Sequence, residues 1–79
     1  MTDEDDLLEA VRDAWAETLG IDTEDVPLEQ GFFDAGGNSL LLVLLWEQLN
    51  ELATHRVQAM DLFQHPTVRA QVQLLAGDL

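Results

Sequence analysis

Apolar residues recur every three or four positions over much of the chain, which is the spacing of one helical face. The first such stretch covers residues 3 to 19, where acidic residues fill most of the positions between. Its inward face is expected to consist of Leu7, Leu8, Val11, Ala14, Trp15, Thr18 and Leu19. Thr2 or Asp3 is a suitable N-cap and Gly20 a natural stop. A first helix is therefore predicted over about residues 3 to 19.

A second helix is predicted over about residues 39 to 53. At about 100° per residue, its apolar positions gather on one arc, with others beside it. The arc holds Leu41, Leu45, Leu49 and Leu52, and beside it lie Leu42, Trp46 and Ala53. Leu40, Val43 and Leu44 fall on the opposite side. A small domain cannot bury a helix all round, so some of these three should stay exposed, unless the long loop or the next helix covers them.

Two shorter helices follow a polar link at Thr54-His55-Arg56. The third is predicted over about residues 58 to 63 and the fourth over about 67 to 76, with Pro66 between them and Thr67 as the cap. The inward residues expected are Val57, Ala59, Leu62 and Phe63, then Val68, Val72 and Leu75. Met60 is expected to point outward. His65, next to Pro66, is interpreted as a turn residue.

These elements predict an all-α fold, a four-helix bundle with a long first loop and a short third helix, in a single domain of residues 1 to 79. The loop, residues 20 to 38, is long for so small a protein, which favours a functional role. Five apolar residues are expected to hold it against the helices: Ile21, Val26, Leu28, Phe32 and Phe33. Phe32 or Phe33 is expected to be the main anchor.

The net charge of the chain limits the kinds of partner that it can bind. Sixteen acidic residues stand against three arginines and no lysine, for a formal net charge of −13. Such a surface repels nucleic acid and anionic lipid, and it favours proteins that carry basic docking patches. The apolar run from Leu40 to Trp46 is too short to span a membrane, and the first residues are no signal peptide. We therefore expect a monomer in the cytoplasm, with no nucleic-acid or membrane partner.

Size and composition argue against catalysis and metal binding. A chain of 79 residues can build one small core but no enclosed active site, so a carrying or binding role is more natural than an enzyme. The chain has no cysteine, and His55 and His65 are too few and too far apart for a convincing zinc site.

The candidate chemistry lies at Ser39, which follows Gly36, Gly37 and Asn38 at the predicted start of the second helix. A serine at that position, or the asparagine before it, can simply cap the helix. No base or oxyanion-stabilising group for a nucleophilic serine is visible, and no lysine supports a phosphate-binding loop. Local chemistry alone leaves the role of Ser39 open.

Two segments together resemble the peptidyl carrier proteins, the thiolation domains of nonribosomal peptide synthesis. The first is FFDAGGNSLLLVLLWEQL, from Phe32 to Leu49, and the second is DLFQHPTV, from Asp61 to Val68. They occur in the family's order and at nearly its spacing, and together they make the resemblance far more specific than Gly-Gly-x-Ser alone.

The resemblance implies that Ser39 carries a covalent 4'-phosphopantetheine, transferred from coenzyme A by a phosphopantetheinyl transferase. Asp34, Gly36, Gly37 and Asn38 would flank the attachment point. The thiol of the arm would hold an aminoacyl or peptidyl group as a thioester. The implied partners are an adenylating enzyme and condensation, thioesterase or tailoring enzymes. A phosphate at a first helical turn also faces the positive end of the helix, which favours it.

Partner docking is expected at Leu40, Val43, Leu44, Glu47 and Met60. Glu47 and Glu51 are either a solvated stripe or contacts for basic residues of partner enzymes. Leu44 departs from the polar or basic residue of many family members, and Leu42 from the more usual small residue. The segment before the third helix lacks the family's common proline and valine pattern. The start at Met1, the acidity and the absence of a Pro-rich or Gly-rich linker suggest a free-standing carrier, and the alternative is an excised domain with an added methionine.

Two other functions stay open. An acyl carrier protein of polyketide or fatty acid synthesis would share the fold and the prosthetic group, although acyl carriers more often have Asp where this chain has Asn38. An unmodified helical domain could instead use Leu40, Val43 and Leu44 to bind a partner helix.

Overall fold

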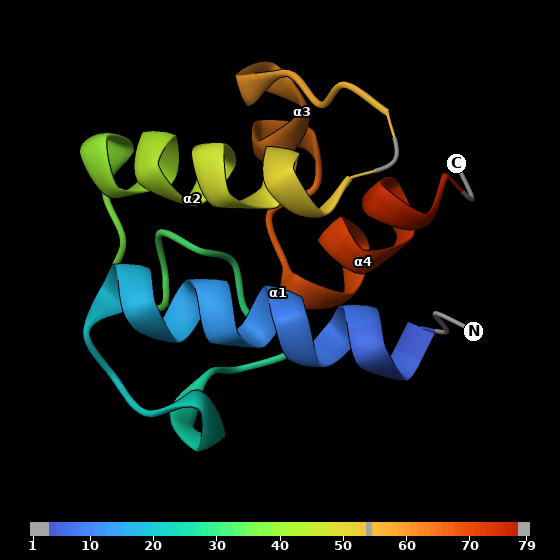
Figure 1. Cartoon of the computed structure of the whole chain (residues 1–79). Helices are drawn as coiled ribbons and strands as arrows, with labels where there is room; N and C mark the ends of the chain where they lie inside the picture. The colour runs from blue at the N-terminus through green and yellow to red at the C-terminus, as the bar shows by residue number, and fades with distance from the viewer. Residues whose placement is uncertain (1–3, 54, 78–79) are drawn as a thin grey trace.

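The computed structural model describes residues 4–53 and 55–77 of the chain. Four α-helices follow one another as α1 (Glu4–Leu19), α2 (Ser39–Leu52), α3 (Ala59–Gln64) and α4 (Val68–Ala76), with a short 3-10 turn η1 (Thr23–Asp25) in the first loop (Figure 1). No strand occurs in the described part of the chain. The predicted all-α fold, with a long first loop and a short third helix, is confirmed. Each observed boundary lies within a residue or so of its predicted one, but the caps expected at Thr2 or Asp3, and the first link residue Thr54, lie outside the described residues.

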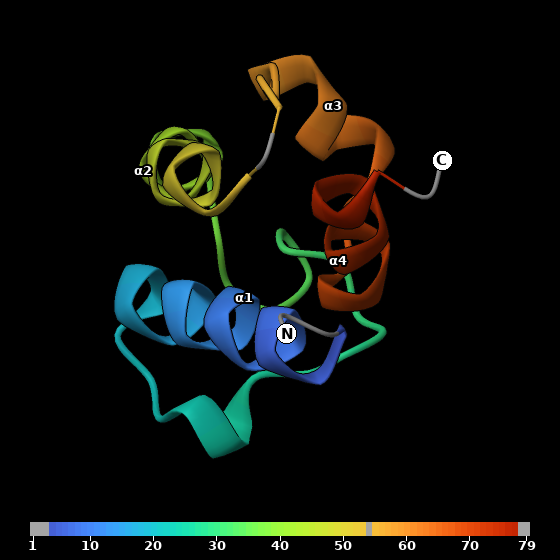
Figure 2. The same cartoon turned by 45° about the vertical axis from the view of Figure 1, so that its right-hand side comes forward.

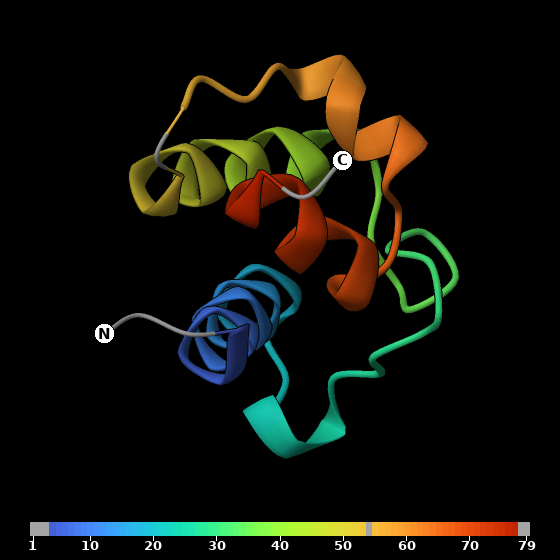
Figure 3. The same cartoon turned by 90° about the vertical axis from the view of Figure 1, so that its right-hand side faces the viewer.

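Helix α1 is the central support of the bundle, since it packs against both α2 and α4. Helix α3 packs on α2, so that α3 and α4 lie on the same side of the α1–α2 pair (Figure 2). The long first loop returns along α1 and passes beside the connection between α3 and α4 (Figure 3). This route brings the loop to the start of α2.

A single apolar core fills the space between the helices. It is formed mainly by Val11, Trp15, Phe32, Leu45, Leu49, Val57, Leu62, Val68, Val72 and Leu75. One polar side chain, Gln71, is also fully buried. Its Oε1 accepts a hydrogen bond from the indole N–H of Trp15 at 2.8 Å, and its Nε2 donates to the carbonyl of His65 at 3.0 Å. Because buried polar groups need partners, this pair of bonds fixes α1 against the α3–α4 turn.

Several apolar residues are more exposed than the sequence predicted, among them Ile21 of the first loop at 38%. Leu52, expected on the core face of α2, is 38% exposed, because the α1 residues across from it are the small Ala10 and Ala14. Phe63, expected to point inward, is 53% exposed. Its neighbour Leu62 fills the interior instead, since a helix as short as α3 buries only one narrow face.

In α2 the expected burial of Leu41 and Leu42 is reversed, and the other sequence-based details of α2 and α3 hold. Leu42, Leu45 and Leu49 are the buried residues of α2, and Leu41 and Trp46 are partly buried beside them. Trp46 donates its indole N–H to the carbonyl of Val57 at 2.7 Å, which ties α2 to the start of α3. His65 lies at the end of α3 as a turn residue, with its Nδ1 2.9 Å from the Asp61 carbonyl oxygen.

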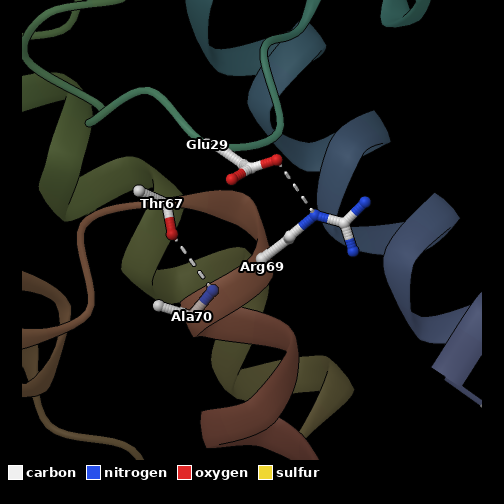
Figure 4. A network of polar contacts seen from close by, with 4 residues as sticks. All are labelled: Glu29, Thr67, Arg69 and Ala70. Atoms are coloured by element: carbon white, nitrogen blue, oxygen red, sulfur yellow. Dashed lines mark hydrogen bonds and ion pairs between the residues drawn. The ribbon is translucent and has the colours of Figure 1, made fainter.

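The first loop is anchored to the turn before α4 by backbone bonds. The amide of Phe32 donates to the carbonyl of Pro66 at 2.9 Å, and the amide of Arg69 donates to the carbonyl of Leu28 at 3.2 Å. The exposed side chains of Glu29 and Arg69 also form an ion pair between these two segments, with Arg69 Nε 3.8 Å from Glu29 Oε2 (Figure 4). The predicted cap at Thr67 is confirmed, since its Oγ1 accepts from the amide of Ala70 at 3.1 Å.

Candidate functional site

Helix α2 begins with a cap that leaves Ser39 uncommitted. The side chain of Asn38 accepts a hydrogen bond from the amide of Leu41 at 2.9 Å, and its backbone carbonyl accepts from the amide of Leu42 at 2.8 Å. Asn38 is therefore the N-cap, and Ser39 is the exposed first residue of the helix. The sequence left both residues open as the cap, and the structure assigns that role to Asn38. The hydroxyl of Ser39 is therefore not used as the helix cap.

The turn before Asn38 requires both of its glycines. Gly36 has φ +110°, a conformation that side chains other than glycine rarely adopt. Gly37 lies directly against the ring of Phe32, so that a Cβ atom at this position would overlap the ring carbons. The amide of Gly37 donates to the carbonyl of Phe32 at 3.0 Å, and the amide of Gly36 donates to that of Phe33 at 3.2 Å. These bonds close a compact turn that leads directly into α2.

Phe32 is the anchor of this turn. Its ring is only 1% exposed and meets the Trp15 ring edge to face, with the centroids 5.1 Å apart. One side of Phe32 thus faces the core, and another supports the backbone of Gly37. Phe33, the other candidate anchor, is 45% exposed. The start of α2 is therefore held in place through Phe32, which connects it to α1.

The predicted flanking residues share one turn with Ser39. Asp34 is exposed, and its backbone carbonyl accepts a weak hydrogen bond from the side-chain Nε2 of Gln30 at 3.4 Å. From Ala35 to Trp46 the chain carries no charged residue, although its net charge is −13. The first turn of α2 likewise contains no acidic residue. A new negative charge at Ser39 would therefore meet little local repulsion, and the positive end of the helix would favour it.

Exposed apolar residues follow Ser39 along α2, and another lies on α3, which packs on α2. Leu40, Val43 and Leu44 of α2 and Met60 of α3 are all exposed, Leu40 most of all at 71%. Glu47, the fifth residue expected in docking, is exposed further along α2. We call Leu40, Val43, Leu44 and Met60 the apolar surface. It leaves the helix start accessible to a large partner.

One further feature of the molecule, a contact between two exposed aromatic rings, was not indicated by the sequence. The rings of Phe33 and Phe63 stack at a centroid distance of 6.0 Å and an angle of 24°, although each is about half exposed. This contact connects the first loop to α3 on the outside of the molecule. The adjacent pair Phe32-Phe33 offered a weak signal, because neighbouring residues in an anchored loop seldom both point inward.

Two other kinds of site find no support in residues 4–53 and 55–77. No group of three or more His, Cys, Asp or Glu residues there could hold a metal ion. No helix of this part of the chain is both long enough and apolar enough to cross a membrane.

Comparison with known proteins identifies the class. The family model described as "Phosphopantetheine attachment site" matches residues 9–75, which include α2, α3, most of α1 and α4, and Ser39. The chain belongs to this family of carrier domains, in which 4'-phosphopantetheine is attached covalently. The resemblance read from the two sequence segments is thus confirmed, and so is the cofactor.

Several synthetases contain similar segments. The chain is 42% identical over 74 residues to polyketide synthase GfsA of Streptomyces halstedii, with 92% of the chain covered. It is 40% identical over 67 residues to nonribosomal peptide synthetase acrB of Aspergillus aculeatus, with 85% covered. It is 36% identical over 66 residues to N-(5-amino-5-carboxypentanoyl)-L-cysteinyl-D-valine synthase of Penicillium chrysogenum, with 84% covered. The chain spans only 1%, 4% and 2% of the length of these three relatives.

A solved structure shares the fold. The free-standing peptidyl carrier protein from an uncharacterized secondary metabolic pathway of Acinetobacter baumannii superposes with a TM-score of 0.86. The match covers 96% of this chain and 95% of that one at 20% sequence identity. At this identity the likeness supports the four-helix carrier fold and not a particular cargo.

The contact of Gly37 with Phe32 makes a prediction about stability. Gly37→Ala should lower the free energy of unfolding by about 1–3 kcal/mol, because the added methyl group forces the ring or the turn to move. Gly31→Ala is the matched control, since a Cβ atom there would make only ordinary contacts. Urea denaturation of both variants measures the difference. Equal free energies of unfolding for the two variants would show that the Phe32 ring does not support the turn.

Proposed function

We propose that Ser39 is the residue that carries the 4'-phosphopantetheine arm. Ser39 is the only serine of the chain, it is exposed, and it lies at the first position of α2 inside the region matched to the attachment-site family. In the proposed modification the Ser39 Oγ attacks the pantetheine-bearing phosphorus of coenzyme A and forms a phosphodiester. The pyrophosphate bond of coenzyme A breaks, 3',5'-adenosine bisphosphate leaves, and the hydroxyl proton passes to a base of the transferase. The single observation that carries this proposal is the cap, because Asn38 takes the structural role that would otherwise explain a serine here.

The helix end can also stabilise the phosphate. Asn38 accepts hydrogen bonds from the amides of Leu41 and Leu42. The amides of Ser39 and Leu40 precede the first hydrogen bonds of the helix and have no acceptor within it. Free amides at a helix start favour an anion through both hydrogen bonding and the helix dipole. Asp34, Gly36, Gly37 and Asn38 flank the site in this proposal. The two glycines keep side chains away from the active site of the transferase.

The cargo we propose is an aminoacyl or peptidyl group, held as a thioester on the thiol of the arm. Gly-Gly-Asn-Ser at the attachment turn favours this type, and several relatives are nonribosomal peptide synthetases. The chain itself would catalyse no step. It would supply the hydroxyl, a rigid base for the arm and a surface that enzymes recognise. Whether it acts free-standing stays a prediction.

The proposed partners act in sequence on the same arm. A phosphopantetheinyl transferase installs it, an adenylating enzyme loads it, and condensation, thioesterase or tailoring enzymes use the thioester. We place these encounters in the cytoplasm and treat the chain as a monomer, whose net charge of −13 disfavours self-association. The proposed docking residues are Leu40, Val43, Leu44, Glu47 and Met60, on the strength of their exposure on α2 and on the α3 helix that packs on it.

A polyketide or other acyl cargo is the second candidate. It is favoured by one observation, the 42% identity to a polyketide synthase over 92% of the chain. Both candidates use the same arm and the same serine, and they differ in the enzyme that loads it.

Attachment is tested by incubating the protein with coenzyme A, magnesium and a broad-specificity phosphopantetheinyl transferase. We expect intact mass to rise by one phosphopantetheinyl group, and Ser39→Ala to abolish the gain while the helical content stays unchanged. Thr23→Ala, which removes a hydroxyl on the first loop, should still be modified. No gain in the wild type, or a gain that survives Ser39→Ala, would contradict the proposal and favour an unmodified helical interaction domain.

The modified protein then distinguishes the two cargoes. Candidate adenylating enzymes with amino acids should form a thioester on it, visible as a further mass gain that hydroxylamine removes. Acceptance of malonyl-type groups alone, from an acyltransferase, would overturn the peptidyl assignment and leave Ser39 as the attachment site.

Docking at the apolar surface is tested with Val43→Glu. Val43 is 44% exposed, so the substitution should leave helicity nearly unchanged and slow thioester transfer with at least one partner by about fivefold or more. Gln73→Glu, on the exposed side of α4, adds the same charge elsewhere and should not slow transfer. Leu45→Glu places the charge in the core and should unfold the domain. Unfolding by Val43→Glu itself would mean that Val43 belongs to the core and would refute docking there.

A further inference from the structure

The connection into α3 is held by two side chains of α2. Val57, which is fully buried, lies two residues before α3 and outside any helix. Its amide donates to the side-chain Oδ1 of Asn50 at 2.9 Å, and its carbonyl accepts from the indole N–H of Trp46 at 2.7 Å. Trp46 and Asn50 are four residues apart, so they lie on one face of α2. We call these two bonds the Val57 clamp.

The Val57 clamp supplies hydrogen bonds that regular structure does not provide at this point. A buried amide or carbonyl outside a helix cannot reach water, and leaving such a group unpaired is costly. Both polar groups of the Val57 backbone therefore depend on side chains of α2. Removing the acceptor of Asn50 or the donor of Trp46 would leave a buried backbone group without its partner.

Helix α3 depends on contacts at its two ends. It contains six residues, of which only Leu62 is buried. A helix this short is not stable alone, because its first turn costs more conformational entropy than its few hydrogen bonds return. Gln71 donates to the carbonyl of His65 at the end of α3, and the Val57 clamp holds its start. The clamp thus determines where the first turn of α3, which carries Met60, lies against α2.

We propose that Trp46 and Asn50 are positioning residues for partner docking, because they hold Met60 in a fixed arrangement with the α2 part of the apolar surface. Both side chains are partly buried and act through Val57. A surface that is ordered before binding loses less entropy on binding than one that must become ordered on contact. The inference rests on the docking proposed above, and it names residues that give the docking surface its shape without belonging to it.

The size of the effect follows from the fraction of molecules in which α3 is in place. The apparent affinity for a partner falls in proportion to that fraction. A partner that uses Met60 should therefore bind more weakly once the clamp is broken. The chemistry at Ser39 should not change, since Asn38 and the two glycines before it are independent of Val57.

The test uses the full chain and a broad-specificity phosphopantetheinyl transferase as the docking probe, with kcat and KM of attachment measured separately. Asn50→Leu should raise KM by about threefold or more and leave kcat nearly unchanged. Asn50→Asp keeps a side-chain oxygen for the Val57 amide and should retain the wild-type KM. Trp46→Phe keeps an aromatic ring but removes the N–H donor, so it should also raise KM, and it carries the test if Asn50→Leu does not fold.

Amide hydrogen exchange locates the change in the molecule. The α3 amides should exchange about tenfold faster in Asn50→Leu, while the amides of α1 keep their wild-type rates. Gln48→Leu is the matched control, since it introduces the same side chain on α2 but removes the 3.1 Å bond to the Thr18 hydroxyl on α1. It should alter neither the exchange of α3 nor KM.

A double-mutant cycle shows whether the effect passes through the docking surface. Met60→Ala alone should raise KM. Combined with Asn50→Leu, it should raise KM by less than the product of the two separate changes, because both disturb the same contact with the partner. A general loss of stability would not depend on the side chain at position 60.

Four results would overturn the inference. They are unchanged exchange of the α3 amides in Asn50→Leu, an unchanged KM in that variant, a KM for Asn50→Asp as high as that for Asn50→Leu, and independent effects of Met60→Ala and Asn50→Leu. A failure of the proposed function looks different. It would appear as no attachment to the wild type, or as undiminished thioester transfer in Val43→Glu.

Discussion

The contact between the Phe32 ring and the backbone of Gly37 is the constraint on which the rest of the site depends. The ring meets Trp15 on α1 and leaves no room for a side chain at Gly37, so the turn before α2 has one place in which it can lie. The amide of Phe32 also bonds to the carbonyl of Pro66, which joins the same residue to the α3–α4 connection. A flexible-looking loop is thereby fixed to two separate parts of the bundle. Ser39, two residues beyond Gly37, inherits a defined position.

The distribution of charge complements this geometry. A protein with sixteen acidic residues keeps its whole segment from Ala35 to Trp46 free of charge, around the start of α2. The helix dipole then favours a negative group at Ser39. Carboxylates return along the seam of α1 and α2, where they face no arginine of this chain. The uncharged region around Ser39 is suited to a phosphate and to apolar partner surfaces.

Much of this arrangement could be predicted from the sequence, because helical periodicity and glycine, proline and threonine signals are local. The four helices and the Thr67 cap followed from such signals. The burial of residues at the edge of the core could not be predicted in the same way. Leu52 and Phe63 are apolar residues on plausible inner arcs, but their exposure depends on alanines across the seam and on a stacking partner in the loop. Gln71 was missed because its partner, Trp15, is distant in sequence and nothing local marks the bond.

The choice between neighbouring residues was also beyond the sequence. Phe32 and Phe33 are chemically identical anchors, and only the direction of the chain through the turn decides that Phe32 enters the core. Asn38 and Ser39 are both good caps, and the extended backbone at Asn38 decides between them. These two choices determine whether the serine hydroxyl caps the helix or is free for chemistry. They required the three-dimensional path of the loop.

The most direct measurement of the central claim is the proton NMR spectrum of the Phe32–Gly37 contact in the protein that carries its arm. The account predicts α-proton signals of Gly37 displaced far from random-coil positions by the ring current of Phe32, with cross-relaxation between those protons and the ring. It also predicts that both features are the same before and after modification. Random-coil shifts for Gly37 without cross-relaxation to Phe32 would contradict the account, because the turn would then have no support from the core.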